Sequence, residues 1–101
     1  MRIIVMFDLP VTLSEDLREY TKFRKHLVKN GFLMRQESIY CKLALNTTVS
    51  EAIIKNVKKN KPRKGLVQIL TLTEKQFSNM ELIVGDYSSD VLDTDERIVI
   101  L

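Results

Sequence analysis

The sequence predicts an α+β fold in which two helices pack on one face of an antiparallel sheet. Three observations lead to this prediction. Apolar runs with the composition of strands occur at residues 2–7, 32–45 and 65–73. Two stretches with apolar residues at helical spacing begin at residues 14 and 48. The chain has 101 residues, of which 45% are hydrophobic and 29% charged, so it is long enough for one core and one domain.

The first strand and the first helix have clear boundaries. Residues 2–7 are almost continuously apolar and end at Asp8-Leu9-Pro10, which indicates a buried central strand stopped by proline. An amphipathic helix is expected over residues 14–30, with Ser14 as its cap, acidic residues in its first turn and Asn30-Gly31 at its end. Its apolar side comprises Leu17, Tyr20, Phe23, Leu27 and Val28.

Residues 32–45 are rich in aromatic and branched side chains and are interrupted by the polar Gln36-Glu37-Ser38. This pattern favours two strands with a tight connection over one bulged strand. Thr48 and Glu51 have the spacing of a capping box, which predicts a second helix that ends before Pro62. Residues 65–73 form a further strand, and Met80–Val84 is a short apolar run closed by Gly85-Asp86.

This order of elements is that of a ferredoxin-like βαββαβ sandwich with an extra strand at its carboxyl end. We expect a single domain over residues 1–101, with a core at 1–84, an acidic loop at 85–96 and a terminal strand at 97–101. The terminal strand is apolar and could pair with the sheet edge of a second copy, which predicts a homodimer. The alternative is that it folds back on its own sheet.

Charge is distributed unevenly along the chain. Residues 1–73 hold fourteen Lys or Arg against six acids, a net charge of +8, whereas residues 74–101 hold two against seven, a net charge of −5. The basic part suits a polyanion such as nucleic acid, and the acidic part suits a basic partner protein. The single cysteine and the lack of a leader or of a run of membrane-spanning length favour a cytoplasmic protein without a membrane partner.

Two motifs resemble a known family. One is the amino-terminal strand that ends on an aspartate, Ile3-Ile4-Val5-Met6-Phe7-Asp8; the other is the glycine-led segment from Gly31 to Tyr40, in which Gln36-Glu37-Ser38-Ile39-Tyr40 matches a Gln-x-Ser-Val-Phe pattern. Together, at this spacing and chain length, they resemble the small CRISPR-associated adaptation nucleases of the Cas-two family. The sequence Phe7-Asp8-Leu9-Pro10 is similar to members from type II (Cas-nine) systems.

The resemblance implies a ferredoxin-like homodimer in which two Asp8 side chains face each other around Mg²⁺, or alternatively Mn²⁺. It also implies a CRISPR integrase subunit as partner, and activity as an endonuclease on RNA or double-stranded DNA. Some family members act instead as a non-catalytic bridge between integrase dimers. From chemistry alone, Asp8 could equally bond backbone amides around the Leu9-Pro10 turn. Without a metal, two apposed carboxylates would repel each other.

The resemblance bears on two other residues. Ser38 lies in the family motif, where it could contact a phosphate or the water shell of the metal, or simply stabilise a turn. The family often has an arginine where this chain has Met34, and Arg35 follows it. Arg35 is therefore a candidate phosphate-binding residue displaced by one position.

Several basic residues are candidates for contacts to the nucleic-acid backbone, which would be salt-sensitive and independent of base sequence. On the first helix they share one face, and after the second helix they form the densest basic run of the chain. They are Arg18, Lys22, Lys25, Lys29, Lys58, Lys59, Lys61, Arg63 and Lys64. A solvated helix face is the alternative for each. We expect His26 to be a surface residue and Cys41 a buried thiol.

Overall fold

Four antiparallel strands form one sheet in the order β2-β3-β1-β4 in the computed structural model, which describes residues 1–85. The strands are β1 (Arg2–Asp8), β2 (Leu33–Gln36), β3 (Ile39–Leu43) and β4 (Leu66–Leu72). The central strand β1 pairs with β3 and with β4, so that Ile4 lies between Cys41 and Leu70. This arrangement confirms the predicted α+β, ferredoxin-like fold. The predicted terminal strand at 97–101 lies outside the described residues.

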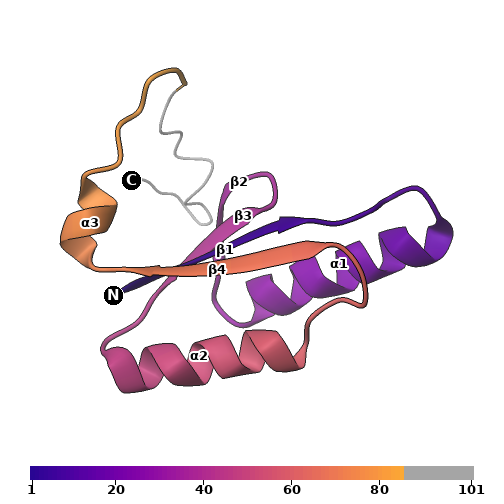
Figure 1. The fold of residues 1–101 in the computed structure, drawn as a ribbon, viewed down its shortest axis with the longest axis horizontal. Helices are drawn as coiled ribbons and strands as arrows, with labels where there is room; N and C mark the ends of the chain where they lie inside the picture. The colour runs from indigo at the N-terminus through magenta and orange to yellow at the C-terminus, as the bar shows by residue number, and fades with distance from the viewer. Residues whose placement is uncertain (86–101) are drawn as a thin grey trace.

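Helices α1 (Ser14–Lys29) and α2 (Thr47–Lys59) cover one face of the sheet (Figure 1). We refer to this face as the helix side. Alternate residues of β1, namely Ile3, Val5 and Phe7, join the core there with Phe23 of α1 and Val57 of α2. Because side chains alternate along a strand, Ile4, Met6 and Asp8 project from the other face. We refer to that second face as the open face.

Phe7 is the centre of the aromatic core. Its ring lies edge-on to Phe23 at a centroid distance of 5.2 Å and stacks on Tyr40 at 5.7 Å. Tyr40 is 1% exposed, and its hydroxyl accepts a hydrogen bond of 2.9 Å from Nε of Arg24. Burying such a large side chain with its polar atom paired adds stability without the cost of an unpaired hydroxyl. The end of β1 is therefore held firmly from the helix side.

The start of α1 differs from the expectation. The residue before the first helical turn is Leu13 rather than Ser14, and the carboxylate of Asp16 accepts a hydrogen bond of 3.3 Å from the Leu13 amide. An acid at the third helical position can satisfy a free amide and also favours the positive end of the helix dipole. Leu17 and Val28 were wrongly assigned to the apolar side, since both are exposed.

The start of α2 also differs from the expectation. The predicted pair Thr48 and Glu51 does not cap the helix; instead, the side chain of Asn46 accepts a hydrogen bond of 2.9 Å from the Val49 amide. Asparagine is among the strongest capping residues, so it takes this role when it precedes a threonine pair. The predicted pair of strands in residues 32–45 is confirmed, with an irregular register between Met34 and Gln36.

A third helix, α3 (Glu74–Ser78), follows β4 and was not predicted. Thr73 caps it, and the side chain of Gln76 bonds back to the Thr73 amide. The apolar run Met80–Val84 forms neither helix nor strand, and its side chains are exposed. Figure 1 shows α3 and this run on the side of the sheet away from α1 and α2. Within residues 1–85, no helix is both long and apolar enough to cross a membrane.

Candidate functional site

Asp8 is the last residue of β1, and its side chain is exposed on the open face. It lines a shallow hollow of about 280 Å³ at the end of the sheet. The lining residues come from β1, from the β2–β3 connection and from the beginning of β4; they are Met6, Phe7, Asp8, Glu37, Ser38, Ile39, Leu66 and Gln68. The predicted site residue therefore lies at the surface, where a ligand can reach it.

The β2–β3 connection brings Glu37 and Ser38 to this hollow. The backbone of Ser38 has a φ of 67°, a left-handed conformation that few residues other than glycine and asparagine adopt readily. Its carbonyl oxygen accepts a hydrogen bond of 3.0 Å from the amide of Phe7. This bond ties the turn to the end of β1, one residue before Asp8. Glu37 was not predicted as a site residue, although it is the variable position of the motif that contains Ser38.

The donor atoms in the hollow suit a hard divalent cation. Mg²⁺ prefers oxygen ligands, retains several waters and commonly uses one or two carboxylates. Asp8 and Glu37 provide carboxylate oxygens, and Ser38 provides a hydroxyl. No group of three or more His, Cys, Asp or Glu side chains gathers around a common point within residues 1–85. The described residues of one chain could therefore provide only part of a magnesium coordination sphere, and a second chain or the phosphate of a substrate would have to complete it.

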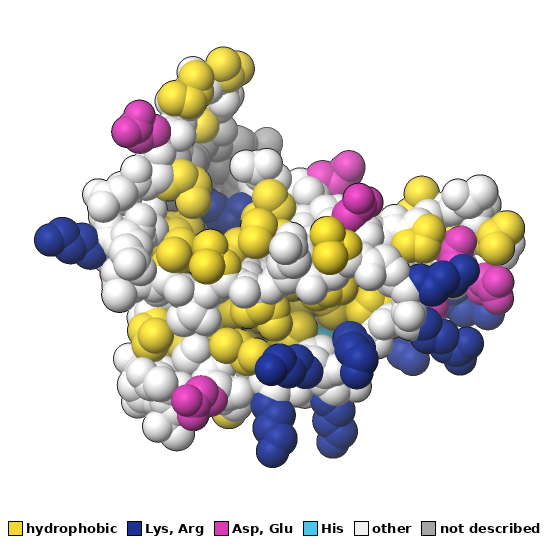
Figure 2. Space-filling model, viewed as in Figure 1, with side chains coloured by type: hydrophobic (Ala, Val, Ile, Leu, Met, Phe, Trp, Pro, Cys, Tyr) yellow, Lys and Arg dark blue, Asp and Glu magenta, His cyan; other side chains and the backbone are white. Residues whose placement is uncertain are grey.

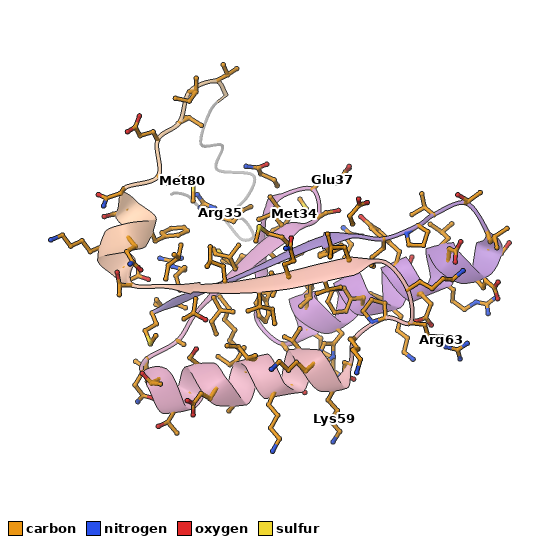
Figure 3. The ribbon with its side chains drawn as sticks, viewed as in Figure 1. Met34, Arg35, Glu37, Lys59, Arg63 and Met80 are labelled. Carbon is orange, nitrogen blue, oxygen red and sulfur yellow. The ribbon has the colours of Figure 1, made fainter. Side chains whose placement is uncertain are left out.

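The predicted phosphate-binding residues lie mainly on the other side of the sheet. All nine of those on α1, α2 and the following segment are exposed: Arg18, Lys22, Lys25, Lys29, Lys58, Lys59, Lys61, Arg63 and Lys64. Figure 2 shows cationic side chains along α2 and around the amino end of α1. In Figure 3, Lys59 projects from the helix side and Glu37 from the opposite side of the sheet. We refer to these nine residues as the basic surface.

Part of the basic surface is organised around a second cavity, of about 280 Å³, where the segment after α2 approaches the amino end of α1. Arg18, Arg63 and Lys64 line it together with Asp16 and Glu19. The ammonium of Lys64 lies 3.2 Å from the Asp16 carboxylate, which is only 6% exposed. Lys64 is therefore partly neutralised, and its first role is to compensate a buried acid.

Arg35 points to the open face rather than to the basic surface. Its guanidinium lies 5.3 Å from the centre of the Phe77 ring, on the side opposite α1 and α2 (Figure 3). Arg2 lies 4.3 Å from the same ring and makes two hydrogen bonds, of 2.8 and 3.1 Å, to Glu74. The bonded guanidinium of Arg2 holds the pKa of Glu74 below its usual value. These contacts attach α3 to the sheet.

Cys41 and His26 were not predicted as site residues, and the structure places them as follows. Cys41 is buried and free, as predicted, and burial raises the pKa of its thiol. His26 is half-buried rather than fully on the surface, and its Nε2 atom has no hydrogen-bond partner among the described residues. Burial, together with the nearby charge of Lys29, lowers the pKa of His26. Neither side chain lines the Asp8 hollow.

The fold and this site together define a class of protein: a small ferredoxin-like sandwich with an exposed carboxylate at the end of its central strand and cations on its helix side. The chain belongs to the Cas2 family, because residues 1–80 match the family model described as CRISPR associated protein Cas2.

Three relatives are similar over nearly their full lengths, and each is named CRISPR-associated endoribonuclease Cas2. The protein of Treponema denticola is 52% identical over the whole of both chains. That of Streptococcus mutans serotype c is 44% identical over all of this chain and 93% of the relative. That of Ligilactobacillus salivarius is 43% identical over the whole of both chains.

Proposed function

We propose that this chain is a CRISPR adaptation protein that takes part in the integration of new spacers and acts as a metal-dependent endonuclease through Asp8. The observation that carries the proposal is the exposed position of Asp8 at the end of β1, in a hollow that Glu37 also lines. The name endoribonuclease, which the relatives bear, supports phosphodiester cleavage. The sequence around Asp8 supports a type II system, and a lone buried cysteine suits the cytoplasm.

In this proposal Asp8 binds Mg²⁺, for which Mn²⁺ could substitute, and Glu37 and Ser38 orient the water shell. When bound, the metal lowers the pKa of a coordinated water and offsets charge that develops on the phosphate. The chain itself presents Asp8 at the surface, where a backbone phosphate of RNA or duplex DNA can approach it. The hydrogen bond from the Phe7 amide to the Ser38 carbonyl oxygen ties the turn that follows Glu37 to the end of β1.

A homodimer would supply the carboxylates that one chain lacks. The open face exposes apolar side chains on strands β2, β3 and β4, and Asp8 lies on that same face. They are Leu33, Leu43, Leu66 and Leu70. Two copies that meet through their open faces would cover this apolar surface and bring two Asp8 residues toward each other. The terminal strand at 97–101 would add pairing at a sheet edge.

A second function has its own supporting observation. The basic surface lies on the helix side, whereas Asp8 lies on the open face, so a duplex bound along the helices would be separated from Asp8 by the sheet. This separation supports a scaffold that holds duplex DNA and bridges CRISPR integrase subunits without cleaving what it holds. Binding and cleavage would then be independent properties of the same dimer.

The test compares the parent protein with two variants in cleavage of labelled single-stranded RNA and duplex DNA, with Mg²⁺ or with a chelator. Asp8→Asn keeps the shape of the side chain and removes its charge, so cleavage should fall by about 100-fold or more. Glu51→Gln, which removes an exposed carboxylate from α2, is the control and should cleave normally. Cleavage by Asp8→Asn at the rate of the parent protein would refute the nuclease assignment.

The scaffold function is tested with the same proteins and a variant in which Lys22, Lys25 and Lys29 are glutamine. Loss of three phosphate contacts should reduce the slope of log affinity against log salt by about two to three. Lys75→Gln, on α3, should leave duplex binding unchanged. If Asp8→Asn still supports spacer acquisition in cells and the triple lysine variant does not, the role is that of a scaffold. If both fail, cleavage contributes to adaptation.

A further inference from the structure

Gly65 joins the basic segment after α2 to the first residue of β4. Its φ of +98° lies in the region that favours glycine. Leu66, the next residue, pairs with Asp8 at the end of the β1–β4 ladder. Gly65 is thus the point where the chain passes from the helix side to the strand that flanks the Asp8 hollow.

The backbone of Gly65 lies directly against the Asp8–Leu9 peptide. A Cβ atom at position 65 would lie 2.8 Å from the carbonyl oxygen of Asp8, 2.6 Å from Cδ2 of Leu9 and 3.1 Å from Cα of Leu9. Two of these three neighbours are backbone atoms, so rotating a side chain cannot relieve the contact. A side chain at position 65 therefore requires one of the two backbone segments to move.

The other two glycines have positive φ values but no such contact. At Gly31 the nearest atom to an added Cβ is Nζ of Lys42, at 3.2 Å, which belongs to the end of a flexible side chain. At Gly85 the nearest is Cδ1 of Leu82, at 3.8 Å, an ordinary van der Waals distance. The close approach to backbone sets Gly65 apart from both.

The two backbone segments that meet at Gly65 both border the Asp8 hollow. Asp8 and Leu66 pair with each other, and both line it. Asp8 is exposed and is the last residue of its strand, whereas Leu9 is buried in the core. Movement of the Asp8–Leu9 peptide would displace the Asp8 carboxylate relative to Glu37 and Ser38.

We infer that Gly65 is a positioning residue for Asp8: the absence of a side chain at position 65 lets the β4 backbone hold the Asp8–Leu9 peptide where the carboxylate faces the hollow. This inference rests on the proposed nuclease function of Asp8. Gly65, which ends the basic segment, would then have a role other than phosphate binding. Small displacements of a catalytic group are costly, because about 1 Å can reduce a rate by about 100-fold.

The test compares Gly65→Ala with Gly85→Ala. The Gly85 variant makes the same change at a positive φ, but its added Cβ atom would have no close backbone neighbour among the described residues. Gly65→Asn is the second variant, because asparagine tolerates the left-handed region better than alanine but still adds a Cβ atom. Two measurements are made on each folded protein: the carbonyl carbon NMR signal of the Asp8 side chain, with and without Mg²⁺, and the steady-state rates of RNA cleavage.

Both Gly65 variants should shift the Asp8 signal and weaken its response to Mg²⁺. Their kcat should fall by about 10- to 100-fold with KM for RNA within about twofold of the parent value. Gly85→Ala should match the parent protein in both measurements. An unshifted Asp8 signal in Gly65→Ala, or recovery of both readouts in Gly65→Asn, would overturn the inference, since backbone strain and not contact would then be the cause.

Loss of the fold in both Gly65 variants, with Gly85→Ala intact, would also count against a positioning role, because the contact would then serve the fold as a whole. Failure of the nuclease function is distinguishable from these outcomes. In that case Asp8→Asn cleaves RNA like the parent protein, while the Asp8 NMR signal still reports whether Gly65 positions the carboxylate.

Discussion

His26 shows how a single residue can make stability depend on pH. It is the only histidine of the chain, and Asn30 bonds to it twice, with its amide nitrogen 3.3 Å from Nδ1 and 2.8 Å from the carbonyl oxygen. Asn30 in turn accepts a hydrogen bond of 3.2 Å from Asn56 of α2. Lys29 and Lys42, the latter bonded to the Asn30 carbonyl, add positive charge around this junction between the helices.

We expect acid to destabilise the protein through His26. Because the folded state lowers the pKa of His26 below 6.5, the unfolded state binds the proton more readily. The stability that neutral His26 contributes is fully present above the unfolded-state pKa of 6.5, and it is lost as the pH falls through the folded-state pKa. Thermal unfolding between about pH 7.5 and about pH 5.5 should therefore show a falling Tm, with a smaller fall for His26→Gln. An equal fall in both proteins would exclude His26 as the cause.

Residue positions were predictable where a pattern in the sequence marked them. Asp8 was expected at the end of an apolar strand, and it lies there and is exposed, whereas its role as a metal ligand stays a prediction. Glu37 was missed, because only the folded hairpin brings its carboxylate to the same hollow. The contact of Arg35 with Phe77 could not be predicted either, because it depends on helix α3, which the sequence pattern did not indicate.

At the scale of elements, the capping residue of α2 can be identified by comparing substitutions at Asn46 and Thr48. Asn46→Ala removes the side-chain acceptor of the Val49 amide and should lower the free energy of unfolding by about 1 kcal/mol. Thr48→Ala, at the position that the sequence favoured as the cap, should change it by less than about 0.5 kcal/mol. Urea unfolding followed by circular dichroism measures both. A larger loss in Thr48→Ala than in Asn46→Ala would place the cap at Thr48.

The long elements could be predicted because their patterns are periodic and bounded. Strand β1, helix α1 and strand β4 were expected within a few residues of their observed limits. Helix α3 could not be predicted in the same way, because five residues are too few to show a periodic pattern. What stabilises α3 is its cap and the contacts of Phe77 with two arginines from distant strands.

At the scale of the whole molecule, the sheet separates two chemical surfaces. The carboxylate of Asp8 and several exposed leucines lie on the open face, and most exposed cations of the described residues lie on the helix side. The uneven charge along the sequence predicts an acidic surface formed by residues 74–101, and most of the acids of that segment lie outside the described residues. It could not indicate that the sheet lies between the basic surface and Asp8, because that depends on which strand residues point toward the helices.

The dimer proposal predicts which face tolerates a new charge. Leu70, 47% exposed on the open face, should become buried between two copies, so Leu70→Glu would place an unpaired charge in the interface. Self-association should weaken by about 100-fold or more. Val28→Glu, at a residue 55% exposed on α1, should leave it unchanged. Light scattering after gel filtration gives the masses, and a Leu70→Glu variant that remains dimeric would exclude the open face.

The position of β1 in the sheet has a consequence for how the protein is made. Of the four strands of this sheet, the central one is synthesised first, and both of its neighbours come from later in the chain. Until β4 has been synthesised, one edge of β1 has no partner, and its apolar residues can pair with other nascent chains. Such distant pairing also slows folding relative to helical proteins of this size. The strand that ends on Asp8 is thus the first of the four to be made, yet one of its edges stays unpaired until the last of them has been made.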